Sequence, residues 1–411
     1  MKFVFGVYNE LADIISILKP KWCDTVFQRY TCFLQDRKRK EGAETYIKSI
    51  LPEIFVGDES NKLEINIPGD SNVKEEFISK LHGFIIEHSN DTNLLILLLN
   101  YIDRGIYKLR ERWIAGKYDF FEIDGLNSNY KDNNILILPR YYCSWEHKNR
   151  GRRNDSSLNK MLYYTYFVDL RKNDKYQIKN IIFQESVFSR IIRHKKVTLG
   201  VSPITNKATL EISKSYDSEN EVNRFNIDGV AEKKEINQKI LDIINLAAKK
   251  KIDILVFPEM LGSEEILLEM NDKLRDIDAP IITVLPSVWK NERNQSIVVD
   301  SVGDEICRQD KHKSYDFTED GKTYFENINS SNTIHILHCY GLGRIVIAIC
   351  KDFLDKTYVD YLISDLHATL ILSPSFSTGV YDFEQMIPKG ASYDCNTVWV
   401  NTCSAQNFSK R

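Results

Sequence analysis

Residues 344–352, read RIVIAICKD, decide the fold of the second half of the chain. An apolar run at 345–349 stops at Cys350 and is followed by the polar pair Lys351 and Asp352. A short apolar run with a sharp polar end predicts a buried strand. Open α/β sheets place their active sites at such strand ends, where the backbone N–H of Lys351 could help to bind an oxyanion. Taken alone, the cysteine could equally be an inert core residue.

Two further stretches strengthen the functional interpretation of Cys350. Residues 251–260, KIDILVFPEM, predict a second apolar strand that ends at Pro258 and Glu259. A carboxylate directly after a buried strand is costly unless it has a partner or a task, although a solvent-exposed loop acid would look the same. Residues 300–315, DSVGDEICRQDKHKSY, predict a turn and a short strand before Lys311 and Lys313. Those lysines could also belong to a solvated basic loop.

Glu259 in VFPEM, Lys311 in RQDKHKSY and Cys350 in IAICKDF resemble, in order and spacing, the nitrilase or carbon–nitrogen hydrolase superfamily. The resemblance covers about residues 195–401 and implies an α/β fold, the four-layer α-β-β-α sandwich of that family. It extends to the segments 368–375, ATLILSPS, and 398–401, VWVN, as later strands. The run 353–356 and the segment 389–396 depart from the family's pattern, which leaves the substrate contacts undefined. Family members also continue beyond the equivalent of Arg411, so we expect a truncated chain, a sheet completed by another chain or an early end.

The resemblance implies a catalytic triad of Glu259, Lys311 and Cys350. Glu259 would be the general base, Lys311 would stabilise the thiolate and the oxyanion, and Cys350 would form a thioester. Lys311 is preferred to Lys313 because the resembled pattern places its lysine just after the strand, with the second glutamate, here Glu319, eight residues further on. Three secondary positions complete the site, namely Glu319 as a second glutamate, the backbone N–H of Lys351 and the acidic Asp352. No metal and no organic cofactor is expected.

Composition fits a soluble protein of two or three domains. The chain has 411 residues, 43% hydrophobic and 27% charged, with a net charge of −3 that argues against a protein built to coat nucleic acid. The longest apolar run, 94–99, is too short for a membrane span, and the N-terminus does not look like a targeting peptide. The eight cysteines have no metal-ligand spacing. We therefore expect reduced thiols and a cytoplasmic location.

The chain divides into three predicted regions. Residues 1–115 are predicted as mainly helical, with the clearest helices at 71–88 and 92–113, and carry no recognisable chemistry. Residues 116–194 are predicted as a mixed α/β connection, with strands at 135–138 and 163–170 and a helical or linker pattern from 181. Residues 195–411 form the hydrolase-like domain, with an inserted loop or hairpin at 206–228.

Three functions are compatible with these patterns. The first is an amidohydrolase that cleaves a non-peptide C–N bond of a small amide or nitrile. The second is a nitrilase-like sensor or effector module of a multidomain protein, for example in bacterial defence, with little or no turnover. The third is nucleic-acid binding by the basic loop 147–154, HKNRGRRN, beside Tyr141, Tyr142 and Trp145, although a solvated loop is the simpler interpretation. The resemblance also implies a homo-oligomer, because family members often pair near the nucleophile.

Overall fold

The computed structural model of the chain describes residues 2–57, 63–64, 71–106, 120–122, 134–140, 143, 158–172, 175–273, 277, 279–391, 393–402 and 404–405. The chain splits into two compact units. The first comprises residues 1–119, 123–141 and 147–174, and the second comprises residues 120–122, 142–146 and 175–411. No helix among the described residues is long and apolar enough to cross a lipid bilayer.

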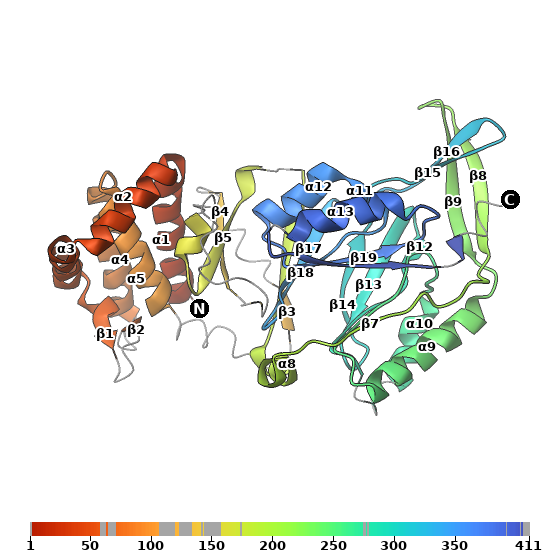
Figure 1. Cartoon of the computed structure of the whole chain (residues 1–411), viewed down its shortest axis with the longest axis horizontal. Coiled ribbons are helices and arrows are strands. Elements are labelled where there is room, and N and C mark those ends of the chain that lie inside the picture. The colour runs from red at the N-terminus through yellow and green to blue at the C-terminus, as the bar shows by residue number, and fades with distance from the viewer. Residues whose placement is uncertain are drawn as a thin grey trace. The chain divides into compact units, whose positions relative to one another are not determined.

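Helices dominate the first unit. They are α1 (Lys2–Leu18), α2 (Asp24–Gln35), α3 (Arg37–Ile50), α4 (Ser71–Glu87) and α5 (Thr92–Gly105) (Figure 1). Residues 94–99 of α5 are all buried, because a helix that is apolar on every side must lie inside its unit. The side chain of Asp91 accepts the N–H of Leu94 and caps the start of α5. The predicted helices at 71–88 and 92–113 are confirmed, the second as far as Gly105.

A two-stranded antiparallel sheet completes the first unit. It pairs β4 (Ile135–Pro139) with β5 (Thr165–Asp169) and is flanked by the short turns η3 (Leu158–Met161) and η4 (Leu170–Lys172). Smaller elements in the same unit are η1 (Lys19–Lys21), η2 (Pro52–Phe55), β1 (Val56–Gly57) and β2 (Leu63–Glu64). The predicted strands at 135–138 and 163–170 are thus confirmed.

Asp103 ties α5 to the start of β5. Its fully buried carboxylate accepts the backbone N–H groups of Tyr163, Tyr164 and Thr165 and the hydroxyl of Thr165. Burial raises the pKa of Asp103, while these bonds oppose that shift. The side chain therefore supplies acceptors to backbone donors that would otherwise be buried without partners.

We expect Asp103→Ala to lower the free energy of unfolding of the first unit by about 3 kcal/mol, because several buried donors lose their acceptor together. Asp36→Ala is the matched control. Asp36 is an exposed N-cap of α3 that accepts one N–H, from Arg39, and its loss should cost about 1 kcal/mol. Urea denaturation followed by hydrogen exchange of the α5 amides measures both variants. Equal losses would contradict the role given to Asp103.

The second unit contains a six-stranded sheet that carries the Cys350 strand near its middle. The strand order is β20-β19-β18-β17-β6-β3. The strands are β3 (Phe120–Glu122), β6 (Gln177–Phe183), β17 (Thr333–Cys339), β18 (Gly343–Ile347), β19 (Leu370–Ser375) and β20 (Asn396–Asn401). Every residue of β18 and β19 is buried, and the two strands pair in parallel. The strands predicted around 344–349, 368–375 and 398–401 are therefore confirmed.

A second six-stranded sheet carries Glu259 and Lys311. Its order is β12-β13-β11-β10-β7, with β14 paired to β13. The strands are β7 (Leu199–Val201), β10 (Ile254–Val256), β11 (Ile282–Val284), β12 (Val288–Lys290), β13 (Arg293–Val299) and β14 (Glu305–Asp310). β7, β10 and β11 run in parallel, so Glu259, just after β10, lies at the carboxyl edge of these strands.

Helices cover the outer faces of the two sheets, which gives four layers (Figure 1). One outer layer contains α9 (Lys233–Lys249) and α10 (Glu265–Lys273), and the other contains α11 (Lys351–Leu354), α12 (Lys356–Asp360), the turn η6 (Tyr361–Asp365) and α13 (Tyr381–Ala391). Apolar residues of α9, at three- and four-residue spacing, pack on β10 and β13. The predicted α/β class with a helical N-terminal region is confirmed.

A third sheet of four strands stands at one end of this unit (Figure 1). Its order is β15-β16-β9-β8, formed from β8 (Leu210–Asp217), β9 (Val222–Val230), β15 (Asp316–Glu319) and β16 (Lys322–Glu326). β8 and β9 form an antiparallel hairpin. The insertion predicted at 206–228 as a loop or hairpin is thus confirmed as a hairpin, which extends two residues further.

The predicted domain boundaries differ from the two compact units. The predicted domain starts at residue 195, but β6 pairs in parallel with β17 through six residue pairs and belongs to the second unit. Residues predicted as helix or linker from 181 are strand as far as Phe183, followed by η5 (Glu185–Phe188) and the short helix α8 (Ser189–His194). Strand pairing over such a sequence separation leaves no local pattern, which explains the difference.

Candidate active site

Cys350 occupies a sharp bend between β18 and α11. Its backbone has φ 47° and ψ −106°, a conformation that costs a non-glycine residue about 1–3 kcal/mol. The bend is held because the N–H of Cys350 donates to the carbonyl of Pro374 at 2.8 Å. The side chain is almost fully buried, at 3% exposure. Strain of this kind collects at functional sites, where it fixes the direction of a side chain.

Glu259 lies three residues beyond the end of β10 and is fully buried. Its Oε2 accepts the backbone N–H of Phe376 at 3.0 Å, and its Oε1 accepts Nδ2 of Asn294 at 2.9 Å. Phe376 follows β19, so the strand next to β18 positions the carboxylate. Burial and the nearby Glu259 raise the pKa of the Cys350 thiol, and the neighbouring Phe376 N–H lowers it. The predicted base and the predicted nucleophile therefore meet.

Lys311 directly follows β14, and its N–H donates to the carbonyl of Asn294 at 2.8 Å. Its buried ammonium donates to Glu259 Oε1 at 2.8 Å and to Glu326 Oε2 at 2.6 Å. An ammonium has three N–H donors, so one remains for a substrate oxygen. Lys313, the alternative lysine, is paired with Asp355 at 2.7 Å on the surface. The structure thus favours Lys311.

Glu326 is the acidic residue that sequence reasoning missed. It is fully buried and accepts Nζ of Lys311, Nδ2 of Asn294 at 2.9 Å and the N–H of Tyr315 at 3.1 Å. The predicted second glutamate, Glu319, lies instead at the end of β15, where it pairs with Lys214 and is 35% exposed. This corrects the assignment of Glu319. The turn between β15 and β16 separates the two glutamates, and only the second returns to the interior.

Two buried carboxylates surround one buried ammonium at this site. Burial raises the pKa of Glu259 against the opposing charge of Lys311. Burial alone would lower the pKa of Lys311, but Glu259 and Glu326 outweigh it and hold that pKa well above its usual range. Burial and the neighbouring Glu259 also raise the pKa of the Cys350 thiol. The resting nucleophile is therefore a neutral thiol that needs a base during attack.

Asp352 supports the loop that carries Lys311. The fully buried carboxylate accepts the N–H of His312 at 3.0 Å and the N–H of Lys313 at 2.7 Å. Since Asp352 lies in α11 beside Cys350, it links the nucleophile's segment to the lysine's segment. Burial raises the pKa of Asp352 to about 7. Asp352 therefore acts as a positioning residue, because its carboxylate holds the backbone N–H groups that follow Lys311.

The raised pKa of Asp352 makes the stability of the fold depend on pH. Because the folded-state pKa lies above the ordinary value of 3.8, folding favours the protonated carboxyl. This contribution is complete below pH 4 and is lost as the pH rises through about 7. We expect the free energy of unfolding of wild type to fall, relative to Asp352→Asn, by about 1 kcal/mol per pH unit in that interval.

Urea denaturation of wild type and Asp352→Asn at pH 5, 6, 7 and 8 measures this difference. Asp355→Asn serves as the control, because Asp355 is a partly exposed carboxylate paired with Lys313. A constant difference between wild type and Asp352→Asn across this range would show that Asp352 is ionised throughout.

Lys351 offers its backbone to the site and its side chain to the surface. Lys351 directly follows the nucleophile and is the first residue of α11. Among the described residues, its backbone N–H has no hydrogen-bond acceptor. The side-chain ammonium pairs with Asp316 on β15. The predicted use of the Lys351 N–H as an oxyanion donor is compatible with this arrangement.

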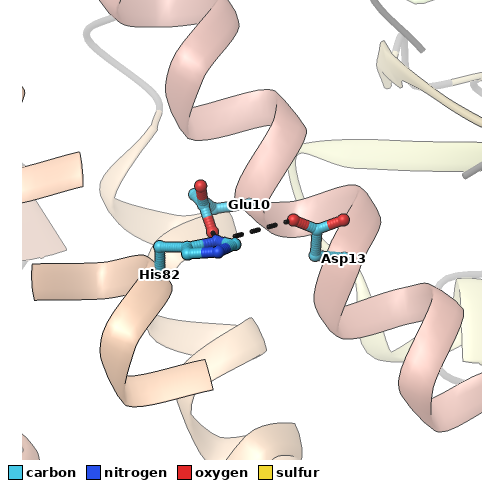
Figure 2. Close-up of side chains that lie close together, drawn as sticks. All are labelled: Glu10, Asp13 and His82. Atoms are coloured by element: carbon cyan, nitrogen blue, oxygen red, sulfur yellow. Dashed lines mark hydrogen bonds and ion pairs between the residues drawn. The ribbon is translucent and has the colours of Figure 1, made fainter. Parts of the chain in front are cut away.

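A separate group in the first unit could hold a metal ion. Glu10 and Asp13 lie one turn apart on α1, and His82 lies on α4 (Figure 2). One ligand atom from each lies within 4.8 Å of the others, and His82 Nδ1 is 3.2 Å from Glu10 Oε2. Burial raises the pKa of both carboxyl groups. A histidine paired with two carboxylates accounts for these contacts without a metal.

The basic loop predicted as a nucleic-acid contact lies outside the described residues. Its flanking Tyr141, Tyr142 and Trp145 lie outside them as well. Nucleic-acid binding therefore stays a prediction of the sequence alone.

No protein-family model matches the sequence, and no curated protein matches it either. Several solved structures match part of the chain. An amidase from Nesterenkonia sp. matches 41% of this chain and 70% of its own, with 16% identity and a TM-score of 0.34. Nit3 of Saccharomyces cerevisiae, a member of the nitrilase superfamily, matches 49% of this chain and 79% of its own, with 13% identity and a TM-score of 0.34. The NitFhit protein of C. elegans matches 41% of this chain and 48% of its own, with 17% identity and a TM-score of 0.32.

The chain thus matches structures from the nitrilase superfamily over part of its length, at low identity.

Proposed function

We propose that this protein is a carbon–nitrogen hydrolase that cleaves a non-peptide amide through a thioester on Cys350. One observation carries the proposal. The strained, buried Cys350 lies close enough to the Glu259 carboxylate for that charge to raise the pKa of its thiol, and Glu259 in turn is held by the buried ammonium of Lys311 at 2.8 Å. A nucleophile, a base and an oxyanion donor are the three groups that acyl transfer requires.

The first step is attack of Sγ on the amide carbon. Glu259 takes the thiol proton as the S–C bond forms, and the C=O electron pair moves onto the oxygen. The remaining N–H of Lys311 and the backbone N–H of Lys351 would bind this oxyanion. Glu326 keeps Lys311 charged and fixed, because it accepts a second ammonium proton at 2.6 Å.

The second step breaks the C–N bond. Protonated Glu259 returns its proton to the leaving nitrogen, so that ammonia or an amine departs and a thioester remains on Cys350. Water then attacks the thioester carbon while Glu259 takes one of its protons. The second oxyanion collapses, the S–C bond breaks, and Glu259 returns that proton to Sγ, which releases the acid and restores the thiol. The cycle consumes one water and leaves the three residues as they began.

Glu259→Gln tests the proposal with a matched control in the same unit. A glutamine keeps the size and the hydrogen-bond acceptor but cannot take a proton, so we expect hydrolysis to fall by about 10²–10⁴-fold. Glu319→Gln changes a glutamate whose partner is the surface residue Lys214 and should keep near wild-type rates. The measurement is release of ammonia or acid from a panel of amides and nitriles. Equal rates for Glu259→Gln and wild type would reject Glu259 as the base.

A further inference from the structure

We propose that the β8–β9 hairpin forms the wall of an acyl pocket beside Cys350, and that Phe225 limits the acyl group to a short, uncharged chain. This inference rests on the proposed hydrolase function. It starts from an apolar hollow whose walls include Leu210, Phe225 and Ile227 of the hairpin. Met260, Tyr315 and Phe376 line the other side.

The second set of wall residues connects the hollow to the reacting groups. Met260 is the neighbour of Glu259, and its N–H donates to Ser287 Oγ at 2.8 Å, which fixes the chain there. The Phe376 N–H donates to Glu259 Oε2 at 3.0 Å and lies near the Cys350 thiol, whose pKa it lowers. Lys311 Nζ lies 6.0 Å from the centre of the Tyr315 ring. An acyl group bound through its carbonyl to Cys350 would therefore extend its chain toward this hollow.

The hairpin is held in place by the sheet that contains Glu319. Lys214 of β8 pairs with Glu319 of β15, and its ammonium also lies 4.8 Å from the centre of the Tyr324 ring. Below this contact, the rings of Phe225 and Phe317 meet edge to face at 5.0 Å. Phe225 is 1% exposed. The glutamate that sequence reasoning placed at the catalytic centre instead pairs with Lys214 and does not line the hollow.

The chemistry of the hollow restricts what it can accept. Among the described residues that line it, only Tyr315 and Thr378 have polar side-chain atoms, and none is charged. A carboxylate or an ammonium on the acyl chain would lose its hydration there without a partner. The empty space reaches about 320 Å³ only when the open solvent at its mouth is included, so the enclosed part is much smaller. These features favour a neutral aliphatic chain of a few carbons.

Binding of aldehydes tests the pocket without requiring turnover. An aldehyde carbonyl carbon bonds to Sγ, and the thiol proton passes through Glu259 to the carbonyl oxygen, which gives a neutral hemithioacetal. We would measure the Kd of propanal, butanal, hexanal, octanal and succinic semialdehyde by calorimetry, with Cys350→Ala as the blank. Butanal and succinic semialdehyde have equal carbon number and differ in one carboxylate, so their comparison isolates charge.

In wild type we expect butanal to bind about tenfold more tightly than octanal and than succinic semialdehyde. Phe225→Leu and Phe225→Ala should shift the preference toward hexanal and octanal by about tenfold, because they lengthen the pocket. Two variants are used because the smaller residue could unfold this buried position, which circular dichroism would reveal. Tyr216→Ala, on the same hairpin but 62% exposed, is the matched control and should keep the wild-type order.

The outcomes separate this inference from the proposed function. Affinities that do not depend on chain length, a Phe225→Leu variant that behaves like Tyr216→Ala, or no binding above the Cys350→Ala blank would each overturn the acyl pocket. If the pocket behaves as expected but no amide is hydrolysed, the hydrolase function fails and the binding site stands. If amides are hydrolysed with no effect of Phe225, the function stands and the pocket fails.

Discussion

Lys311→Met is expected to cause the largest loss of stability of any single change at the site, about 3–5 kcal/mol. The substitution keeps the length of the side chain but leaves Glu259 and Glu326 facing each other, fully buried, with no cation between them. Removing one partner from a buried charge network costs more than the network itself contributes, because the remaining charges cannot regain water. Denaturation with urea measures the change.

The same variant should hydrolyse amides about 10²–10³-fold more slowly, because a buried oxyanion donor is lost. Lys313→Met is the control, since Lys313 forms one surface pair with Asp355 and such pairs contribute about 0–1 kcal/mol. The double variant Lys311→Met with Glu326→Gln separates the two effects. It should regain part of the stability, because one of the unpaired carboxylates is gone, and none of the activity. Full stability in Lys311→Met would contradict the buried network.

Cys350→Ala is expected to abolish amide hydrolysis, because no other group in the site can carry the acyl intermediate. Two neighbours position this nucleophile. The backbone N–H of Cys350 donates to the Pro374 carbonyl at 2.8 Å, and Glu259 lies near its thiol. Alanine preserves the bend with φ 47° at the same strain, so the fold should persist. Circular dichroism and the urea midpoint check this point beside the rate.

Cys339→Ala is the matched control for Cys350→Ala. Cys339 is fully buried on β17, the strand next to β18. Its change to alanine therefore also removes a buried thiol from the same sheet. It should lower stability without a large change in rate. Hydrolysis by Cys350→Ala above the rate without protein would remove Cys350 from the mechanism.

The strand ends that carry the site could be predicted because each combines an apolar run with a sudden polar residue. β10 before Glu259 and β18 before Cys350 are buried along their whole length, and apolar residues make up all of β10 and the run 345–349 that leads to Cys350. Lys311 could be chosen over Lys313 from its place directly after β14. The signal is local in each case, which is why a single sequence sufficed.

Glu326 could not be predicted in the same way. It is the last residue of β16, whose other residues are exposed or half-buried, so no apolar run marks the glutamate that turns inward. β6 was missed for a related reason, since its partner β17 lies about 150 residues further along the chain. In the pocket, Phe225 follows a polar stretch and is buried only because β15 and β16 pack against the hairpin. Contacts between segments far apart in the sequence decide whether these residues are buried or paired.

Mass spectrometry can detect the acyl group trapped on Cys350. The protein would be mixed with the amide that it hydrolyses fastest, quenched in acid and digested, and the peptide that contains Cys350 would be weighed. The account predicts a mass gain equal to the acyl group in place of one hydrogen, removed by hydroxylamine and absent from Cys350→Ala. Amide hydrolysis with no acyl group on Cys350 at any quench time, or with the acyl group on another residue, would contradict it.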